Sequence, residues 1–381
     1  MKGLLCWVIV AARLMRYFAY RLGLAKCPLF LDIREEVAAC IGHVLRWKTR
    51  LRVVGPGNCP RSGPAVFAGN HQKIDDPLSM WKAVLEGSGH GILSHFMSRD
   101  DFFDSLKGKP IGRLLKSRLI DLDELTVLLG TFQISRENVR ISQMRPFFKV
   151  LKDGECFIMY PTGTRTRTGT FMEYRDGVEE PGGVGFFLAH AQRGNPEAAV
   201  PAVPLSRTHN PVKKHDALVF GEPLYLAPNA NREEQRDFDL RLVVAMAQGV
   251  EVNVAHLTSA ILYLRCLHGL DGPVSVRVIE NAIREVVDGL EGRYVDPAAR
   301  NDLPRELKRT LRFLEKSGML RRSGVRVFPH CQAILSAPPP DSGYRKANPA
   351  KYLTNQILHL GDVCAALERV VLAMVSETGG D

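Results

Sequence analysis

A histidine and an aspartate five positions apart form the first candidate catalytic pair of this sequence. His71 follows the apolar run 65–68, and Asp76 comes immediately before Pro77. A carboxylate that accepts a hydrogen bond from one imidazole nitrogen fixes the tautomer of the ring and leaves the other nitrogen free to accept a proton. The pair could act as a general base with its orienting carboxylate. A turn would have to bring the two side chains together, because five residues of regular helix place them about 140° apart.

The same residues also have a purely structural explanation. Aspartate followed by proline is typical of a helix start, with Asp76 as N-cap and Pro77 at the first helical position. Asp76 would then only cap a helix, and His71 would only satisfy a turn. A strand that leads into a helix nevertheless displays His71 at a strand end, where catalytic groups are often found. The pair therefore needs support from other parts of the chain.

A candidate anion-binding arginine follows a second apolar run. Phe132 and Ile134 alternate with polar residues, which predicts a strand that ends by presenting Arg136. The guanidinium group of an arginine can hold a phosphate through two parallel hydrogen bonds. A surface ion pair between Arg136 and Glu137 is the structural alternative.

A loop rich in glycine, threonine and arginine is the third candidate. The continuous apolar run 156–160 predicts a buried strand, and it leads directly into 161–169, Pro-Thr-Gly-Thr-Arg-Thr-Arg-Thr-Gly. Glycine lets the backbone approach a ligand closely, N–H groups and hydroxyls donate hydrogen bonds, and arginines supply positive charge. The loop is therefore a candidate phosphate site, with a solvated basic loop as the alternative.

The elements around these residues alternate between strand and helix, which predicts an α/β domain with a mixed central sheet flanked by helices. The predicted strands are 45–56, 64–68, 92–98, 130–136, 156–160, 198–205 and 217–225, and the predicted helices are 77–86, 142–152 and 182–191. The stretch 101–118 is predicted to be a further basic helical region.

The C-terminal third has a different pattern. Three helices are predicted at 254–268, 275–288 and 304–316, followed by a β-hairpin at 318–328. Three helices and a basic hairpin also describe a winged helix, so a DNA-binding module is a rival interpretation. We predict three parts: an N-terminal amphipathic helix in 1–30, a catalytic domain in 31–250 and a mainly helical, winged-helix-like accessory domain in 251–381.

Composition limits the partners and the compartment. The 381 residues carry a net charge of +10, which suits an anionic partner such as a phosphorylated substrate, an anionic lipid or a nucleic acid. The eight cysteines are scattered, without a Cys-x-x-Cys pair. This spacing argues against a zinc site and a disulfide scaffold, and it fits a reducing compartment.

The first 22 residues predict a membrane-associated helix. Arg13, Arg16 and Arg21 fall with Lys2 on one side of a helical wheel, and apolar residues gather opposite them. Each arginine near the middle of a membrane span would cost about 2.5–3.5 kcal/mol, so a helix lying in the interface fits better than a spanning helix. A signal peptide and an amphipathic helix packed on the domain are the alternatives.

Taken together, four blocks resemble the glycerolipid acyltransferases, the family that acylates glycerol-3-phosphate, dihydroxyacetone phosphate and lysophosphatidate. The resemblance covers roughly residues 45–225. The blocks are Asn70-His71-x4-Asp76, Gly130-x-Phe132-x-Ile134-x-Arg136, Tyr160-Pro161-Thr162-Gly163-Thr164-Arg165 and Val200-Pro201-Ala202-Val203-Pro204.

The resemblance implies a role for each matching position. His71 would be the general base that deprotonates the acceptor hydroxyl, and Asp76 would orient it. The donor would be acyl-CoA or acyl-carrier protein, and no metal or redox cofactor is implied because the thioester is already activated. The enzyme would act in phospholipid biosynthesis on the cytoplasmic face of a membrane, with a bacterial inner membrane as the expected location and no nucleic-acid partner. The residues implied in binding the phosphorylated glycerol acceptor are Arg136, Gly163, Thr164 and Arg165.

One position departs from the family pattern. The third block usually carries glutamate where this chain has Thr162. The change raises the alternative of a catalytically silent, lipid-binding relative. The stretch 165–169 is closer to the glycerol-3-phosphate and dihydroxyacetone-phosphate branch, as is the tail 351–359, whereas Asn70-His71 is closer to the lysophosphatidate branch. The acceptor therefore stays open between these branches.

Overall fold

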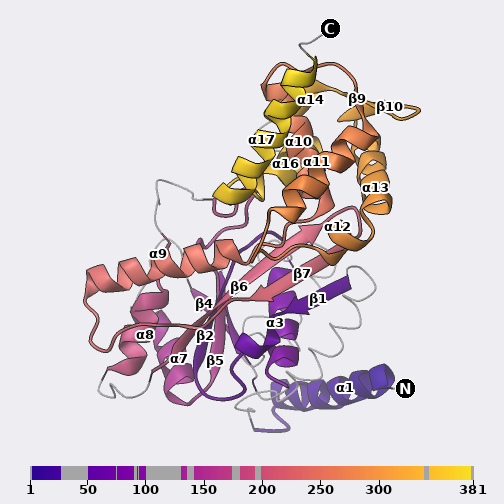
Figure 1. The fold of residues 1–381 in the computed structure, drawn as a ribbon. Coiled ribbons are helices and arrows are strands. Elements are labelled where there is room, and N and C mark those ends of the chain that lie inside the picture. The colour runs from indigo at the N-terminus through magenta and orange to yellow at the C-terminus, as the bar shows by residue number, and fades with distance from the viewer. Residues whose placement is uncertain are drawn as a thin grey trace.

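The computed structural model describes residues 2–26, 50–73, 75–89, 92, 94–99, 130–134, 141–173, 181–193, 199–338 and 343–378. Its centre is a mixed sheet in which the strands of the described ranges run in the order β1-β7-β6-β2-β5-β3-β4, with β8 paired to β6 (Figure 1). The strands are β1 (Arg50–Val54), β2 (Ala65–Gly69), β3 (Ser94–Arg99), β4 (Thr131–Ile134), β5 (Cys156–Met159), β6 (Pro201–Asn210), β7 (His215–Phe220) and β8 (Leu224–Tyr225).

The direction of the strands decides where the functional residues meet. β2, β3, β4, β5 and β6 run parallel to one another, whereas β7 is antiparallel to β6 and parallel to β1. The ends of β2, β5 and β6 therefore lie at the same edge of the sheet as the beginnings of β7 and β1. The predicted fold class, an α/β fold with a mixed sheet flanked by helices, is confirmed.

Both faces of the sheet are covered, because successive side chains of a strand point to opposite faces. Phe67 and Ile158 pack with the helix α3 (Asp76–Gly87), and their neighbours Ala68 and Phe157 pack on the opposite face. The helices of that second face are α7 (Ile141–Lys152), α8 (Val184–Gln192) and α9 (Arg232–Gln248) (Figure 1). Burial on two sides explains why these strands are continuous apolar runs in the sequence.

The C-terminal part contains the three predicted helices and the predicted hairpin, whose turn is at Gly324-Val325. The short strand β9 joins the hairpin as a third strand. Helix α17 was not predicted, and neither was α9. The elements are α10 (Val254–Leu267), β9 (Val274–Ser275), α11 (Val276–Asp288), α12 (Pro297–Asn301), α13 (Leu303–Lys316), β10 (Leu320–Ser323), β11 (Arg326–Pro329), α14 (Cys331–Leu335), α15 (Tyr344–Ala347), α16 (Pro349–Asn355) and α17 (Gly361–Thr378).

One hydrophobic core continues from the sheet into these C-terminal helices. A single cluster of buried residues extends from Val66 in β2 to Met374 in α17. Val250, Val252 and Val254 are at most 2% exposed, so the chain stays inside the core where the catalytic and accessory parts are predicted to meet. The two parts therefore share their packing instead of being joined by a solvated linker.

A disulfide bond corrects the interpretation of the cysteines. Cys266 of α10 is bonded to Cys331 of α14, with 5.1 Å between their Cα atoms and 65 residues between them in the sequence. The spacing of the cysteines gave no sign of this pair, because the two helices meet only in the folded chain. Cys59, Cys156 and Cys364 are free.

Helix α1 (Lys2–Arg21) carries an exposed apolar stripe. The stripe consists of Val8 and Met15 and continues to Leu22, just after the last residue of the helix; the three are spaced by seven residues and are 56%, 68% and 59% exposed. Tyr17, on another side of the helix, is fully buried. Within the described ranges, none of the helices combines the length and the apolar character that crossing a membrane requires.

Candidate active site

The predicted catalytic pair is assembled by a tight turn between β2 and α3. The Nδ1 atom of His71 lies 2.7 Å from Oδ2 of Asp76. The Nε2 atom of His71 has no hydrogen-bond partner among the residues that the structure describes, and the side chain is 17% exposed. The carboxylate thus holds one ring nitrogen and leaves the other facing outward to accept a proton.

Asp76 does not cap the helix, which corrects the structural alternative. Asp75 occupies the N-cap position and makes no side-chain capping bond, and Asp76 is the first residue of α3. The Oδ2 atom of Asp76 instead accepts hydrogen bonds from the backbone N–H groups of Gln72 at 2.5 Å and Lys73 at 2.7 Å. The carboxylate therefore closes the turn that carries His71, and this is how residues five positions apart come into contact.

A buried arginine that the sequence analysis missed completes the pair. Arg207 of β6 is fully buried, and its Nη1 atom donates to Oδ1 of Asp76 at 2.5 Å. Burial alone would raise the pKa of Asp76, but the charge of Arg207 and the hydrogen bond from His71 lower it below its ordinary value. Arg207 thus keeps the fully buried carboxylate ionised behind His71.

The same arginine links the pair to a second carboxylate and a second histidine. The Nε atom of Arg207 donates to Oδ2 of Asp216 at 2.9 Å, and Asp216 also contacts Nδ1 of His209. The pKa of Asp216 would be raised by burial, but the hydrogen bond from His209 and the charge of Arg207 keep it well below its usual range. Asp75 adds weaker contacts of 3.2 and 3.3 Å to the guanidinium group.

Asn70 fixes this network to the backbone. Its Nδ2 donates to the carbonyl of Arg207 at 2.9 Å, and its Oδ1 accepts from the N–H group of Arg207 at 2.7 Å. Asn70 is 1% exposed, so both bonds are sheltered from water. The residue before His71 therefore sets the register of β6 against β2, and with it the position of Arg207.

The predicted phosphate loop lies directly against the histidine. Tyr160, at the end of β5, stacks on the ring of His71 with 4.3 Å between the ring centroids. The N–H group of Thr166 donates to the carbonyl of His71 at 2.9 Å. Gly163 has a φ of +62° and Arg165 is exposed, so the part of the loop next to Thr166 carries exposed backbone and an exposed positive charge.

Thr162, the residue that departs from the family pattern, makes a local contact in this loop. Its hydroxyl donates to the carbonyl of Thr164 at 3.3 Å. The site thus brings together His71, Asp76, Gly163, Thr164 and Arg165. Arg136 lies outside the residues that the structure describes, as does the stretch 101–118, so their predicted roles stay predictions.

A glutamate of this chain already occupies the far half of the loop. The carboxylate of Glu173 accepts hydrogen bonds from the N–H groups of Arg167 at 2.5 Å and Thr168 at 3.1 Å, and from the hydroxyls of Thr166 and Thr168 at 3.1 and 3.2 Å. Burial would raise the pKa of Glu173, but these hydrogen bonds lower it. The anion-binding geometry predicted for 161–169 is therefore filled internally at 166–168, which leaves 163–165 for a ligand.

The C-terminal helices hold the loop from the other side. The carbonyl of Arg167 accepts from the N–H group of Tyr344 at 3.1 Å, and that of Thr168 accepts from Nδ2 of Asn355 at 2.8 Å. Gly169 has a φ of +90°, and a Cβ atom at this position would lie 2.4 Å from the carbonyl oxygen of Tyr352. The chain therefore needs glycine here for both its conformation and its contact with α16.

We expect Gly169→Ala to reduce any activity of this site strongly and to destabilise the protein by more than about 1 kcal/mol. The added methyl group can be placed only by moving either the loop or α16, because the obstructing atom belongs to the backbone. Urea denaturation and turnover assays would measure both effects. Gly154→Ala is the matched control, since its φ is +79° but its Cβ would meet open space. Equal effects of the two substitutions would contradict the role of the α16 contact.

Comparisons with known proteins match the part of the chain that carries His71 and the loop 161–169. Residues 50–180 match the family model described as Acyltransferase. Among solved structures, the chain is similar to PlsC, the 1-acyl-sn-glycerophosphate (LPA) acyltransferase from Thermotoga maritima. The identity is 17%, the match covers 64% of this chain and 92% of that chain, and the TM-score is 0.38. No curated protein matches the sequence.

Proposed function

We propose that this chain, whose residues 50–180 match the Acyltransferase family model, transfers a fatty acyl group from a thioester to the hydroxyl of a phosphorylated glycerol. The donor is acyl-CoA or acyl-carrier protein, and the acceptor is glycerol-3-phosphate or a lysophospholipid such as lysophosphatidate. The observation that carries the proposal is the bond of 2.7 Å between His71 and the buried, ionised Asp76, with the free Nε2 beside a basic loop. The activity belongs to phospholipid biosynthesis.

The reaction follows from the position of the base. Nε2 of His71 removes the proton of the acceptor hydroxyl as its oxygen attacks the thioester carbonyl, and Asp76 stabilises the imidazolium that forms. The tetrahedral intermediate then collapses with loss of the thiolate, which takes the proton back from His71. A positioned base of this kind contributes about 10²- to 10⁴-fold to the rate.

The acceptor phosphate is held by 163–165 in this proposal. Glu173 already neutralises the donors at 166–168, whereas Arg165 is exposed and has no acidic partner among the described residues. The bond from Thr166 to the carbonyl of His71 keeps this half of the loop next to the base. Phosphate binding would thus fix the acceptor hydroxyl within reach of Nε2.

Membrane association is the further part of the proposal. The exposed stripe of Val8, Met15 and Leu22 on α1 is suited to lie in the interface of a bilayer, and a net charge of +10 favours an anionic leaflet. The enzyme would then meet its lipid product and its lysophospholipid acceptor at the cytoplasmic face of the membrane as a peripheral protein.

Acyl transfer by the purified full-length protein tests the proposal. Labelled palmitoyl-CoA and palmitoyl-carrier protein would each be offered with glycerol-3-phosphate, dihydroxyacetone phosphate and lysophosphatidate. Turnover with one pair would name both substrates. Lack of turnover with every pair, together with binding of phospholipid, would favour the catalytically silent relative that Thr162 suggests, and Thr162→Glu would be the next variant to assay.

We expect Arg165→Ala to raise the KM for the acceptor by about tenfold or more with a smaller change in kcat, because a charge-assisted bond to phosphate is lost. Steady-state kinetics with varied acceptor would measure the effect. Arg167→Ala is the matched control, since Arg167 is also exposed but lies within the part of the loop that Glu173 fills. An unchanged KM for Arg165→Ala would place the phosphate elsewhere.

A further inference from the structure

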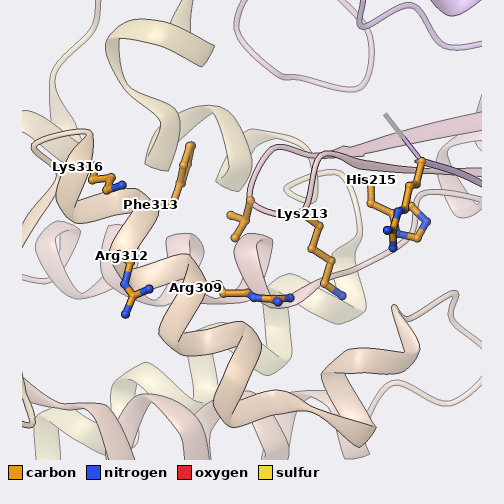
Figure 2. Close-up of a pocket in the computed structure, with 8 residues that line it drawn as sticks. Lys213, His215, Arg309, Arg312, Phe313 and Lys316 are labelled. Atoms are coloured by element: carbon orange, nitrogen blue, oxygen red, sulfur yellow. The ribbon is translucent and has the colours of Figure 1, made fainter. Parts of the chain in front are cut away.

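A basic cleft lies between the end of the sheet and the accessory helices. Its volume is about 630 Å³, which is the size of a small-molecule site. Figure 2 shows Arg309, Arg312, Phe313 and Lys316 along helix α13, with Lys213 and His215 on the segment that faces it. The residues that line the basic cleft are Arg50, Val212, Lys213, His215, Arg309, Arg312, Phe313 and Lys316.

Part of this positive charge is not neutralised by the protein. Lys213 is paired with Asp296 at 2.9 Å and with Glu306 at 3.4 Å, and Arg309 is paired with Glu306 at 2.8 Å. Within the part of the chain that the structure describes, no carboxylate lies within ion-pair distance of the side chains of Arg50, Arg312 and Lys316. The lining includes no acidic residue, so the basic cleft is suited to an anion with several charges.

The shape and the aromatic residue narrow the class of ligand. The ring of Phe313 is half-buried in the lining, and an aromatic ring of this kind can stack on a nucleobase. Arginine and lysine bind phosphate groups. A concave site with one aromatic ring and several cations therefore fits a phosphorylated nucleoside better than it fits a carrier protein or a DNA duplex, both of which present larger surfaces.

The basic cleft opens at the edge of the sheet that carries His71. β6 pairs with β2 up to Leu205 and continues to Asn210, which is opposite His215 of β7. Five residues along β6 and two strand spacings across the sheet place the cleft roughly 20 Å from the end of β2. The cleft is therefore separate from the catalytic site but lies at the same edge.

We propose that the basic cleft binds the 3′-phosphorylated adenosine diphosphate of a coenzyme A thioester, so that the donor enters over α13 and its acyl group reaches His71. This assignment rests on the proposed function. The pantetheine arm joins the diphosphate to sulfur through about 13 covalent bonds, which in an extended chain cover roughly 15 Å. That length is comparable with the separation of the cleft from the end of β2, and the arm would pass over the turn between β6 and β7. The C-terminal part thus contributes half of the donor site.

Calorimetric titration of the full-length protein with coenzyme A and with dephospho-coenzyme A, which lacks the 3′-phosphate, tests the assignment. We expect coenzyme A to bind about tenfold more tightly than dephospho-coenzyme A. The double variant Arg312→Gln/Lys316→Gln should weaken coenzyme A binding by about tenfold or more and remove the preference for the 3′-phosphate. Both side chains are exposed, so we expect the double variant to have the same melting temperature as the wild type. Arg326→Gln, an exposed arginine on the hairpin, is the matched control and should keep the wild-type Kd.

The outcomes separate this assignment from the proposed function. Wild-type affinity of the double variant for coenzyme A would overturn the assignment, and so would a wild-type protein that does not bind coenzyme A. Acyl transfer from a carrier protein without coenzyme A binding would overturn it while supporting the proposed function. Coenzyme A binding that depends on Arg312 and Lys316, without any acyl transfer, would support the assignment and remove the proposed function. If the wild type binds a DNA duplex and not coenzyme A, and the double variant loses the DNA binding, the assignment is overturned in favour of a DNA-binding module.

Discussion

We expect His71→Ala to abolish acyl transfer while the protein stays folded. In the proposed reaction, the substitution removes the atom that accepts the proton of the acceptor hydroxyl, and among the described residues no other imidazole is hydrogen-bonded to the loop 163–165. The loss should be at least about 10²-fold and up to about 10⁴-fold in kcat. Turnover assays with saturating donor and acceptor, and a thermal melt of the same preparation, would measure activity and folding together.

The fold should tolerate this change because His71 lies on a turn. Its side chain is 17% exposed, and Asp76 keeps its bonds to the backbone of the turn and to Arg207 when the imidazole is removed. His268→Ala is a suitable control, since His268 is paired with Glu368 at the far side of the C-terminal part. A His71→Ala variant that keeps more than about a tenth of the wild-type kcat would remove the assignment of the general base.

Arg207→Leu should cost about 3–5 kcal/mol of folding free energy at neutral pH, the range expected when one member of a buried ion pair is removed. Asp76 and Asp216 would stay buried without their counter-charge, and the turn that holds His71 would lose its anchor on β6. Urea denaturation at pH 7 would measure the loss. Arg207→Lys keeps the positive charge but cannot contact Asp76 and Asp216 at the same time as the guanidinium group does. We therefore expect a loss of folding free energy between those of the wild type and Arg207→Leu.

The pH dependence gives a second test of the same contact. The folded-state pKa of Asp76 lies below its ordinary value of 3.8, so its contribution to stability is present above pH 3.8 and is lost as the pH falls through the folded-state value. Without Arg207 that pKa should rise. The difference in the free energy of unfolding between the wild type and Arg207→Leu should therefore become smaller as the pH is lowered from 7 toward 4. A deficit below about 0.5 kcal/mol at pH 7 would contradict the central role of Arg207.

Local patterns were sufficient for the elements that carry the chemistry. Alternation and apolar runs placed β2, β5 and β6 and the helix after His71, because each pattern depends on neighbours within a few residues. The same local rules wrongly placed Asp76 at the N-cap position, because an Asp-Pro pair marks the start of a helix without showing whether the aspartate caps it. Only the folded turn shows that this side chain points back to His71.

The residues that the sequence did not reveal act across long separations in the chain. Arg207 and Asp76 are 131 residues apart, and Asn355 reaches Thr168 across 187 residues. Arg207 gave no local signal, because its neighbours Ser206 and Thr208 are polar and the predicted strand 198–205 ends before it. Glu173 lies close in sequence to the loop that it fills, but its carboxylate was indistinguishable from that of any surface glutamate.

The contact between Gly169 and α16 also restricts how this protein can evolve. A side chain at position 169 would meet the carbonyl of Tyr352, and Asn355, one turn further along the chain, holds the neighbouring Thr168. A mutation at 169 is therefore tolerated only in a lineage in which α16 has already moved away from the loop. A shift of α16 is in turn harmless only where the loop can move with it. The loop and α16 should therefore be inherited together. A chimaera that joins residues 1–250 of this chain to the C-terminal part of a distant relative should lose the loop geometry where the loop meets α16.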